Sequence, residues 1–550
     1  MKTFNHHKYS PTASIPIKNR TWPNRVIKQA PRWVSVDLRD GNQALIKPMD
    51  IRKKQQMWAL LVKLGFKEIE VGFPSASQPD YDFIRWLIDE NKIPSDVTIQ
   101  VLVPARESLI VRTFEALRGV SQAIVHLYNS TSPVQRERVF KLDREGIINI
   151  ACHGASWIKR EACGYPQTKW TFQYSPESFS STEPDFAVEI CNAVLDVWEP
   201  TAQQKSIINL PSTVEVATPN VFADQVEYFS THIGRRDSVV LSVHTHNDRG
   251  GAVASSELAM LAGAERVEGT LFGNGERTGN MDIVTMAMNL YSQGIDPELD
   301  LSKPDQIIEV YQKCTNLNVH ARHPWVGELV YTAFSGSHQD AIRKCLQVQK
   351  PNEPWQVAYL PIDPRDIGRD YQALIRVNSQ SGKGGIAFIL ERDYGIMVPR
   401  WLQAEVAQLV QHESEKQGGE IDSKTIYKLF QKQFVADNFP MQLQHYQLNQ
   451  QAGKHMLDIW LNEHGKDVSL NGSGEGTLSA FVDAWLQHTG QQINIVDYHE
   501  HAITTGTDAQ AVAYVQLTID EQCMSGAAFD VDIISASFKA ILSTINRSKL

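Results

Sequence analysis

The stretch Ser238-Val-Val-Leu-Ser-Val-His244-Thr-His246-Asn-Asp248 joins an apolar, β-branched run to a cluster of polar side chains. Residues 238–243 predict a buried strand. His244 and His246 are two positions apart, and side chains alternate across a strand, so both imidazoles are expected on the same side. Two imidazoles on one side suit a divalent cation. This stretch therefore predicts a strand that ends in a pair of metal ligands.

Similar apolar runs recur roughly every 25 to 48 residues, with helix-like segments such as 48–64, 185–197 and 253–264 between them. The runs cover residues 33–38, 68–73, 97–103, 122–127, 170–174, 206–210, 238–243 and 266–271. Eight strands alternating with helices within about 250 residues predict an α/β fold of the (β/α)8 TIM-barrel type. A doubly wound open sheet is the competing fold, but its glycine-rich fingerprint is missing after the first run.

Polar or glycine-rich sequence follows each run, and barrel enzymes carry their catalytic groups at these strand ends. The first run leads into Arg39-Asp40. Because the first strand of a closed barrel pairs with the eighth, Asp40 is expected near His244 and His246. One carboxylate and two histidines leave positions open for substrate and water, as a catalytic metal requires. Arg39 could hold a carboxylate or a developing oxyanion beside that metal.

Other strand ends offer further candidates. Glu177 could act as a general base, or it could simply neighbour a helix N-cap. His126, Ser175 and Thr213 could hydrogen-bond a small anionic substrate, or could be turn and cap residues. The loop 273–280 lacks the spacing of a dinucleotide motif, and its glycines favour close backbone approach to a ligand or to the metal site. The Gly-Lys-Gly-Gly sequence at 382–385 lacks the features of a phosphate-binding loop and favours a plain loop.

Composition excludes several classes of protein. No stretch of about 18 apolar residues occurs, and the polar N-terminal sequence does not resemble a secretory signal, so no membrane association is expected. The 6 cysteines form no C-x-x-C pair, which favours a reducing, cytoplasmic location without a disulfide framework. The formal charge of −10 argues against nucleic acid as a partner.

The regular alternation of predicted strands and helices ends near residue 325. We expect an N-terminal arm (1–30), the barrel (31–325), a helical and mixed linker region (326–435) and a C-terminal α+β domain (436–550). Strands are expected at 441–448, 455–462, 492–499 and 511–519, and helices at 477–488 and 535–546, which indicates two βββα-like halves. Two small-residue loops, one containing Gly472 and Gly474 and the other Gly506, Asp508 and Ala509, could form a pocket for a small effector or could be structural turns.

Taken together, these residues resemble the 2-isopropylmalate synthases, in the longer form with a C-terminal leucine-regulatory domain. The strongest segments are Val36-Asp-Leu-Arg39-Asp40-Gly-Asn-Gln43, Glu70-Val-Gly-Phe-Pro-Ser-Ala-Ser77, Ser242–Gly250 and Gly273-Asn-Gly-Glu-Arg-Thr-Gly-Asn280. D-x-R-D-G-x-Q with H-x-H-x-D marks a wider group that includes homocitrate and citramalate synthases. Tyr174–Glu177, Asn209–Thr213 and Ile362–Arg369 are similar to the isopropylmalate synthase branch.

The resemblance implies a metal-dependent Claisen condensation of acetyl-CoA with 3-methyl-2-oxobutanoate, followed by thioester hydrolysis to 2-isopropylmalate and CoA. It implies Mg, Zn or Mn as the divalent metal, a homodimer, and feedback inhibition by L-leucine. The implied metal ligands are Asp40, His244, His246 and Asn280. The implied catalytic residues are Arg39, Glu177, His338 and Tyr371, the last two supplied by the second subunit.

The resemblance also implies a substrate pocket. Thr213 would bind the substrate carboxylate. The residues implied around the substrate are His126, Leu102, Tyr128, Ser175 and Asn209. The positions around the branched side chain supply no cation, which favours an isopropyl group over a second carboxylate. The loops of Gly472, Gly474, Gly506, Asp508 and Ala509 would form the regulatory site.

Two alternatives stay open at this point. The first is another Claisen condensation, with 2-oxoglutarate or pyruvate as the acceptor. The second is a catalytically silent ligand sensor whose C-terminal domain is the functional part, against which the complete set of metal ligands argues.

Overall fold

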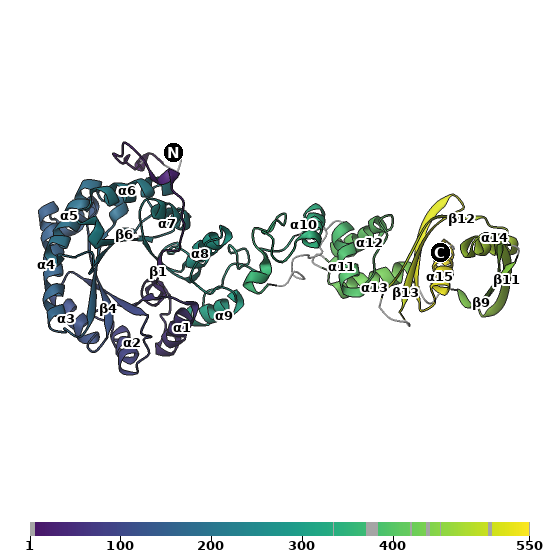
Figure 1. The fold of residues 1–550 in the computed structure, drawn as a ribbon, viewed down its shortest axis with the longest axis horizontal. Helices are drawn as coiled ribbons and strands as arrows, with labels where there is room; N and C mark the ends of the chain where they lie inside the picture. The colour runs from purple at the N-terminus through teal and green to yellow at the C-terminus, as the bar shows by residue number, and fades with distance from the viewer. Residues whose placement is uncertain are drawn as a thin grey trace. The chain divides into compact units, whose positions relative to one another are not determined.

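Parallel strands β1 to β8 close into a barrel in the N-terminal part of the chain (Figure 1). The computed structural model describes residues 6–548 except 11, 334, 370–382, 418–420, 436–439, 452 and 504–508. β1 closes the barrel by pairing with both β2 and β8, so that Ser35 lies opposite Ile69 and Gly269. The strands are β1 (Arg32–Ser35), β2 (Glu68–Gly72), β3 (Thr98–Pro104), β4 (Gln122–Ser130), β5 (Lys169–Glu177), β6 (Ser206–Ser212), β7 (Val239–Thr245) and β8 (Arg266–Gly269).

Helices surround the barrel strands (Figure 1). They are α1 (Ile51–Leu64), α2 (Gln78–Asp89), α3 (Glu107–Ala116), α4 (Arg144–Cys163), α5 (Pro184–Trp198), α6 (Pro219–His232), α7 (Ala252–Leu261), α8 (Ile283–Ser292) and α9 (Pro304–Thr315). In α1, the Asp50 side chain caps the start by accepting from the Lys53 N–H, and Gly65 ends the helix at φ 103°. Met57 and Leu61 are buried on the inward face of this helix. The predicted TIM barrel is therefore confirmed.

The first strand is shorter than the sequence predicts. The prediction extends it to residue 38, but β1 ends at Ser35 and a π-helical turn, Asp37–Gly41, follows. The Asp37 carboxylate accepts from the Leu271 N–H at 3.1 Å, which ties this turn to the segment after β8. The turn is what carries Arg39 and Asp40 to the barrel mouth.

The chain divides into two units, Met1–Val330 with Asp366–Gly368, and Tyr331–Arg365 with Arg369–Leu550. The second unit begins with the helices α10 (Gly336–Val348), α11 (Lys383–Tyr394), α12 (Gln403–Gln417) and α13 (Ser423–Phe434). Within the described part of the chain, no helix is both long and apolar enough to cross a bilayer.

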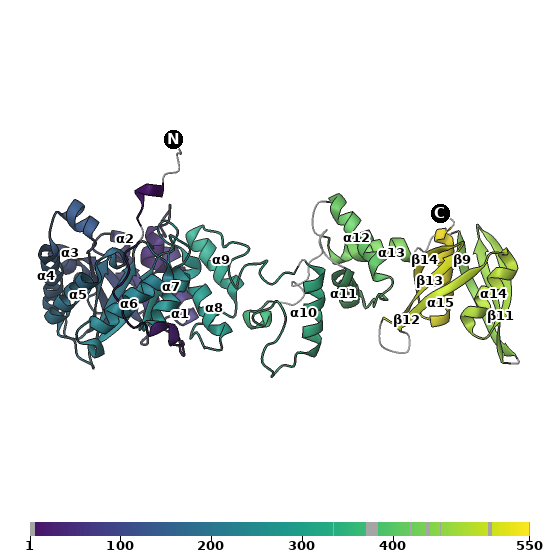
Figure 2. The same ribbon diagram turned by 90° about the horizontal axis from the view of Figure 1, so that it is seen from above.

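Two βββα halves follow these helices, as predicted (Figure 2). They are β9 (Met441–Gln451), β10 (Lys454–Glu463), β11 (Lys466–Gly474) and α14 (Thr477–Thr489), then β12 (Ile493–Ala502), β13 (Ala511–Ile519), β14 (Gln522–Asp530) and α15 (Ile533–Ser548). Each half forms an antiparallel three-stranded sheet. Phe481 and Trp485 from the first half share one hydrophobic core with Leu517, Phe538 and Ile541 from the second.

Candidate metal centre and the surrounding pocket

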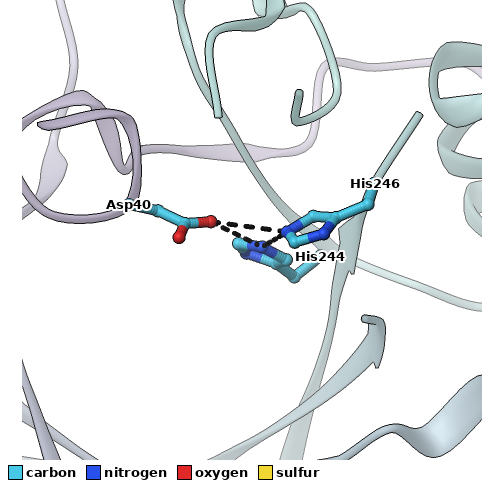
Figure 3. Close-up of side chains that lie close together, drawn as sticks. All are labelled: Asp40, His244 and His246. Atoms are coloured by element: carbon cyan, nitrogen blue, oxygen red, sulfur yellow. Dashed lines mark hydrogen bonds and ion pairs between the residues drawn. The ribbon is translucent and has the colours of Figure 1, made fainter. Parts of the chain in front are cut away.

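Three side chains converge at the carboxyl ends of β1 and β7 (Figure 3). Asp40 Oδ2 lies 3.2 Å from His244 Nε2 and 3.5 Å from His246 Nε2. The two imidazole Nε2 atoms are 3.1 Å apart. All three residues are buried, and their ligand atoms lie within 4.8 Å of one another. The expectation that both histidines and Asp40 meet at the mouth of the barrel agrees with this geometry.

The donor atoms fit a divalent cation. One carboxylate oxygen and two imidazole nitrogens form a mixed O and N set with open positions. Asn280 lies beside this set, because it forms an isolated β-bridge with His246. Its Nδ2 donates to the Asn274 carbonyl at 3.0 Å, while its Oδ1 is buried with no hydrogen-bond partner among the described residues. A metal ligand is one role that would account for that oxygen.

Glycines make the approach of Asn280 possible. A Cβ on Gly275 would lie 2.3 Å from Asn280 Nδ2. Gly279 has φ +99°, and a Cβ there would lie 1.9 Å from the Gly273 carbonyl oxygen. The glycines of this loop therefore let it fold closely on itself and place Asn280 beside the histidines.

Charges around the site favour an ionised Asp40. Burial would raise the pKa of Asp40, but the Arg39 guanidinium at 2.9 Å and the hydrogen bonds from His244 and His246 hold that pKa well below its usual value. Burial would lower the pKa of His244, but the carboxylates of Asp40 and Glu268 raise it to about 9. Arg39 also donates through Nε to Glu70, so two carboxylates fix its guanidinium.

A cavity of about 590 Å³ opens next to these ligands. Its walls contain most of the residues that the sequence singled out in the barrel: Arg39, Asp40, Leu102, His126, Tyr128, Ser175, Glu177, Asn209, Thr213, His244 and His246. Glu177, at the end of β5, accepts a hydrogen bond from Ser130, at the end of β4. Thr213 Oγ1 accepts from the Ser178 N–H at 2.8 Å, which leaves its own proton to be donated. The structure therefore gathers the predicted barrel residues into one pocket.

One wall of this pocket is polar, and the donors of its histidine and asparagine are engaged within the protein, although Asn209 Oδ1 has no hydrogen-bond partner among the described residues. His126 Nδ1 lies 2.9 Å from the Glu70 carboxylate, which can only accept, so Nδ1 carries a proton. His126 Nε2 lies 2.7 Å from Ser175 Oγ, and Ser175 accepts from Asn209 Nδ2 at 3.0 Å. The donors of His126 Nδ1 and Asn209 Nδ2 are thus engaged with protein acceptors, and this wall offers little to a charged substrate group.

Some predicted residues lie elsewhere. His338 is on α10 in the second unit, where it is exposed and its ring stacks on Tyr359 at 3.9 Å. Tyr371, Gly506 and Asp508 lie outside the described residues. Ala509 precedes β13.

Gly472 and Gly474 lie at the end of β11. A Cβ on Gly472 would come within 2.4 Å of the Ala484 backbone nitrogen, and one on Gly474 within 2.3 Å of Ser479 Oγ. Both glycines therefore have a structural role in packing β11 against α14.

The sequence did not single out three charged residues of the site, of which two are fully buried and the third, Arg277, is exposed. Glu70 on β2 and Glu268 on β8 are fully buried behind His126 and His244. Arg277 Nη2 lies 2.6 Å from His246 Nδ1 and 2.6 Å from the Thr213 carbonyl oxygen. For Glu70 and Glu268 the one signal available was the presence of charged residues within the short strands β2 and β8, which is unusual for a parallel sheet.

Comparisons with known proteins identify the family of the chain. The family described as HMGL-like matches residues 30–310, the one described as alpha-isopropylmalate synthase, post-catalytic domain-like, matches 328–391, and the LeuA allosteric (dimerisation) domain matches 420–549. The 2-isopropylmalate synthase of Azotobacter vinelandii (strain DJ) is 54% identical over 542 residues, covering 98% of this chain and 97% of that protein. That of Pseudomonas savastanoi pv. phaseolicola is 53% identical, covering 98% of this chain and 97% of that protein. That of Alcanivorax borkumensis is 52% identical, covering 99% of this chain and 98% of that protein. The chain therefore belongs to the 2-isopropylmalate synthase family.

Proposed function

We propose that this chain condenses acetyl-CoA with 3-methyl-2-oxobutanoate and hydrolyses the resulting thioester, releasing 2-isopropylmalate and CoA. The observation that carries the proposal is the convergence of Asp40, His244 and His246 beside Arg39 at the mouth of a closed barrel. The chain would act in the cytoplasm as a homodimer, in the first committed step of leucine biosynthesis.

Asp40, His244 and His246 would hold the divalent metal, with Asn280 completing or flanking the set. The metal would supply Lewis acidity toward the ketone and carboxylate oxygens of the 2-oxo acid. Nitrogen and oxygen donors admit magnesium, zinc or manganese.

The side chains around this centre would handle the charges and the protons. Glu177, with His338 and Tyr371 from the second subunit, would serve in removing a proton from the methyl group of acetyl-CoA. The new carbon–carbon bond moves charge onto the ketone oxygen, where the Arg39 guanidinium would stabilise it. Thr213 would donate its hydroxyl proton to the substrate carboxylate. Water then replaces CoA at the thioester carbon, which yields a carboxylic acid and the free thiol.

The pocket wall supports a branched aliphatic acceptor. His126, Ser175 and Asn209 hydrogen-bond to one another or to buried carboxylates, and Leu102 and Tyr128 lie beside them. A second substrate carboxylate would find no cation in this group, and it would approach the charge of Glu70. An isopropyl group needs no such partner and buries apolar surface.

We also propose the division of labour along the chain: an arm (1–30), the catalytic barrel (31–325), a linker region that completes the partner's site (326–435) and a leucine-binding, dimerising domain (436–550). The match of residues 420–549 to an allosteric dimerisation domain supports the last assignment. Leucine would bind near Gly472, Gly474, Gly506, Asp508 and Ala509. Inhibition there would be allosteric, because the two sites are distinct.

A CoA-release assay with a thiol reagent tests the activity. We expect the highest kcat/KM with 3-methyl-2-oxobutanoate, loss of turnover in a chelator, recovery on adding a divalent metal, and inhibition by leucine. A higher kcat/KM with pyruvate or 2-oxoglutarate would contradict the substrate assignment. Release with none of the three acids, metal present, would favour the silent sensor instead.

A further inference from the structure

Glu268, on β8, lies behind the metal centre and is fully buried. Its Oε2 is 3.0 Å from Nδ1 of His244, while Nε2 of the same imidazole faces Asp40 and His246. A carboxylate beside the outer nitrogen of a ligating histidine commonly fixes the ring's tautomer and orientation. Glu268 has the position to do this for His244.

The direction of the hydrogen bond matters for ligation. An ionised carboxylate can only accept, so Nδ1 of His244 carries a proton. In the neutral ring this leaves the lone pair on Nε2, the atom that faces Asp40. His246 differs, because its Nδ1 lies 2.6 Å from Arg277 Nη2, and a guanidinium can only donate. Glu268 therefore gives His244 a defined ligating tautomer that the corresponding contact of His246 does not provide.

The carboxylate of Glu268 is itself held in place. Its Oε1 accepts from Arg266 Nη1 at 2.8 Å, from Gln173 Nε2 at 2.8 Å and from Gln100 Nε2 at 3.2 Å. Arg266 and both glutamines are fully buried. Several bonds to one oxygen leave Oε2 with little freedom, so the orientation of His244 rests on a fixed partner.

We propose that Glu268 is a positioning residue that makes His244 the anchoring ligand of the divalent metal. This rests on the metal-dependent function proposed above. A competing explanation is that Glu268 serves the barrel alone, as the buried partner of Arg266. The two explanations predict different metal affinities for Glu268 variants that still fold.

Two substitutions separate them. Glu268→Asp keeps a negative charge near Arg266 but shortens the reach toward His244, and Glu268→Gln keeps the length but removes the charge. Dissociation constants for Zn²⁺ and Mn²⁺, measured on the full chain against a competing chelator and without substrates, are expected to rise by about 10- to 100-fold in both. Excess metal should restore turnover in Glu268→Asp. The unfolding midpoint of the metal-free Asp variant should stay near that of the wild type.

Gln173→Met is the matched control, because Gln173 is equally buried and touches the opposite oxygen of Glu268. We expect its metal affinity to stay within about threefold of the wild type, well short of the loss from a disrupted histidine partner. Metal affinity in both Glu268 variants within that margin would overturn the proposal, as would a wild-type chain that binds neither metal. If the Gln variant does not fold, the Asp variant decides. Tight metal binding without CoA release would instead refute the proposed function and leave this inference standing.

Discussion

Replacing Asp40 with Asn removes the charged member of the proposed metal centre while preserving its size. The Asp40 side chain is only 7% exposed and lies 2.9 Å from Arg39 Nη1 and 3.2 Å from His244 Nε2. In the variant, Arg39 keeps Glu70 as a partner, but the centre loses its negative ligand. We therefore expect metal affinity and turnover to fall together.

The expected size of the loss follows from burial. Removing one member of a buried charge pair costs about 3–5 kcal/mol. At about 1.4 kcal/mol per factor of ten, the metal dissociation constant should rise by roughly 100- to 4,000-fold. The His244 pKa should also fall below its value of about 9, because the Asp40 carboxylate is one of the two groups that raise it.

Metal titration against a chelator, together with CoA release at several metal concentrations, measures both effects. Asp50→Asn is a suitable control, since Asp50 caps α1 through the Lys53 N–H and Asn caps helices equally well. Asp40→Asn with metal affinity and turnover within about tenfold of the control, a loss under about 1.4 kcal/mol, would refute the assigned ligand role.

Three further changes probe the loop, the C-terminal domain and pH. Gly279→Ala should lower kcat/KM by about 100-fold, because the added Cβ would lie 1.9 Å from a backbone carbonyl oxygen and displace the loop. Unchanged kinetics in the CoA-release assay would contradict this expectation. Gly472→Ala should destabilise the C-terminal domain by about 1–3 kcal/mol in urea unfolding. Gly476→Ala is the control and should not, because the nearest atom to its added Cβ is 3.9 Å away. Equal effects of the two substitutions would contradict the packing role of Gly472. The bond from Arg136 lowers the pKa of Glu183 to about 2, so the pair stabilises the fold above pH 4.5 and loses that effect as the pH falls toward 2. Glu183→Gln should therefore cost about 1 kcal/mol at pH 7, and the difference from wild type should shrink below pH 4.5; a pH-independent difference would contradict the pairing.

The barrel was predictable because two signals coincide along the chain. Apolar runs recur at barrel spacing, and each run ends in polar residues, as at Arg39-Asp40 and His244-x-His246. Strand alternation then placed both imidazoles on one side, as the structure shows.

The buried charges behind the site were not predictable from the sequence. Glu70 and Glu268 lie in the middle of strands, where a single sequence gives no indication that closure of the barrel will surround each carboxylate with cationic and amide partners. Apart from Arg266, which lies with Glu268 on β8, their partners come from other segments of the barrel, so local periodicity carries no information about them.

The sequence predicted two βββα-like halves in the C-terminal domain but did not locate the third strand of either half, β11 and β14. β11 and β14 contain glycine and serine where side chains would normally mark a strand, because α14 and α15 pack closely against them. A Cβ on Gly526 of β14 would lie 2.3 Å from Thr544 Oγ1 on α15. Small residues required by helix packing thus resemble loop sequence.

The most direct test of the central claim is to identify the product. The full chain, with a divalent metal and carbon-13-labelled acetyl-CoA, would receive equimolar 3-methyl-2-oxobutanoate, pyruvate and 2-oxoglutarate, and the products would be analysed by mass spectrometry. We predict that labelled 2-isopropylmalate dominates and that its formation ceases in the Asp40→Asn variant at low metal concentration. Labelled citramalate or homocitrate as the main product, or no labelled condensation product at all, would contradict the account.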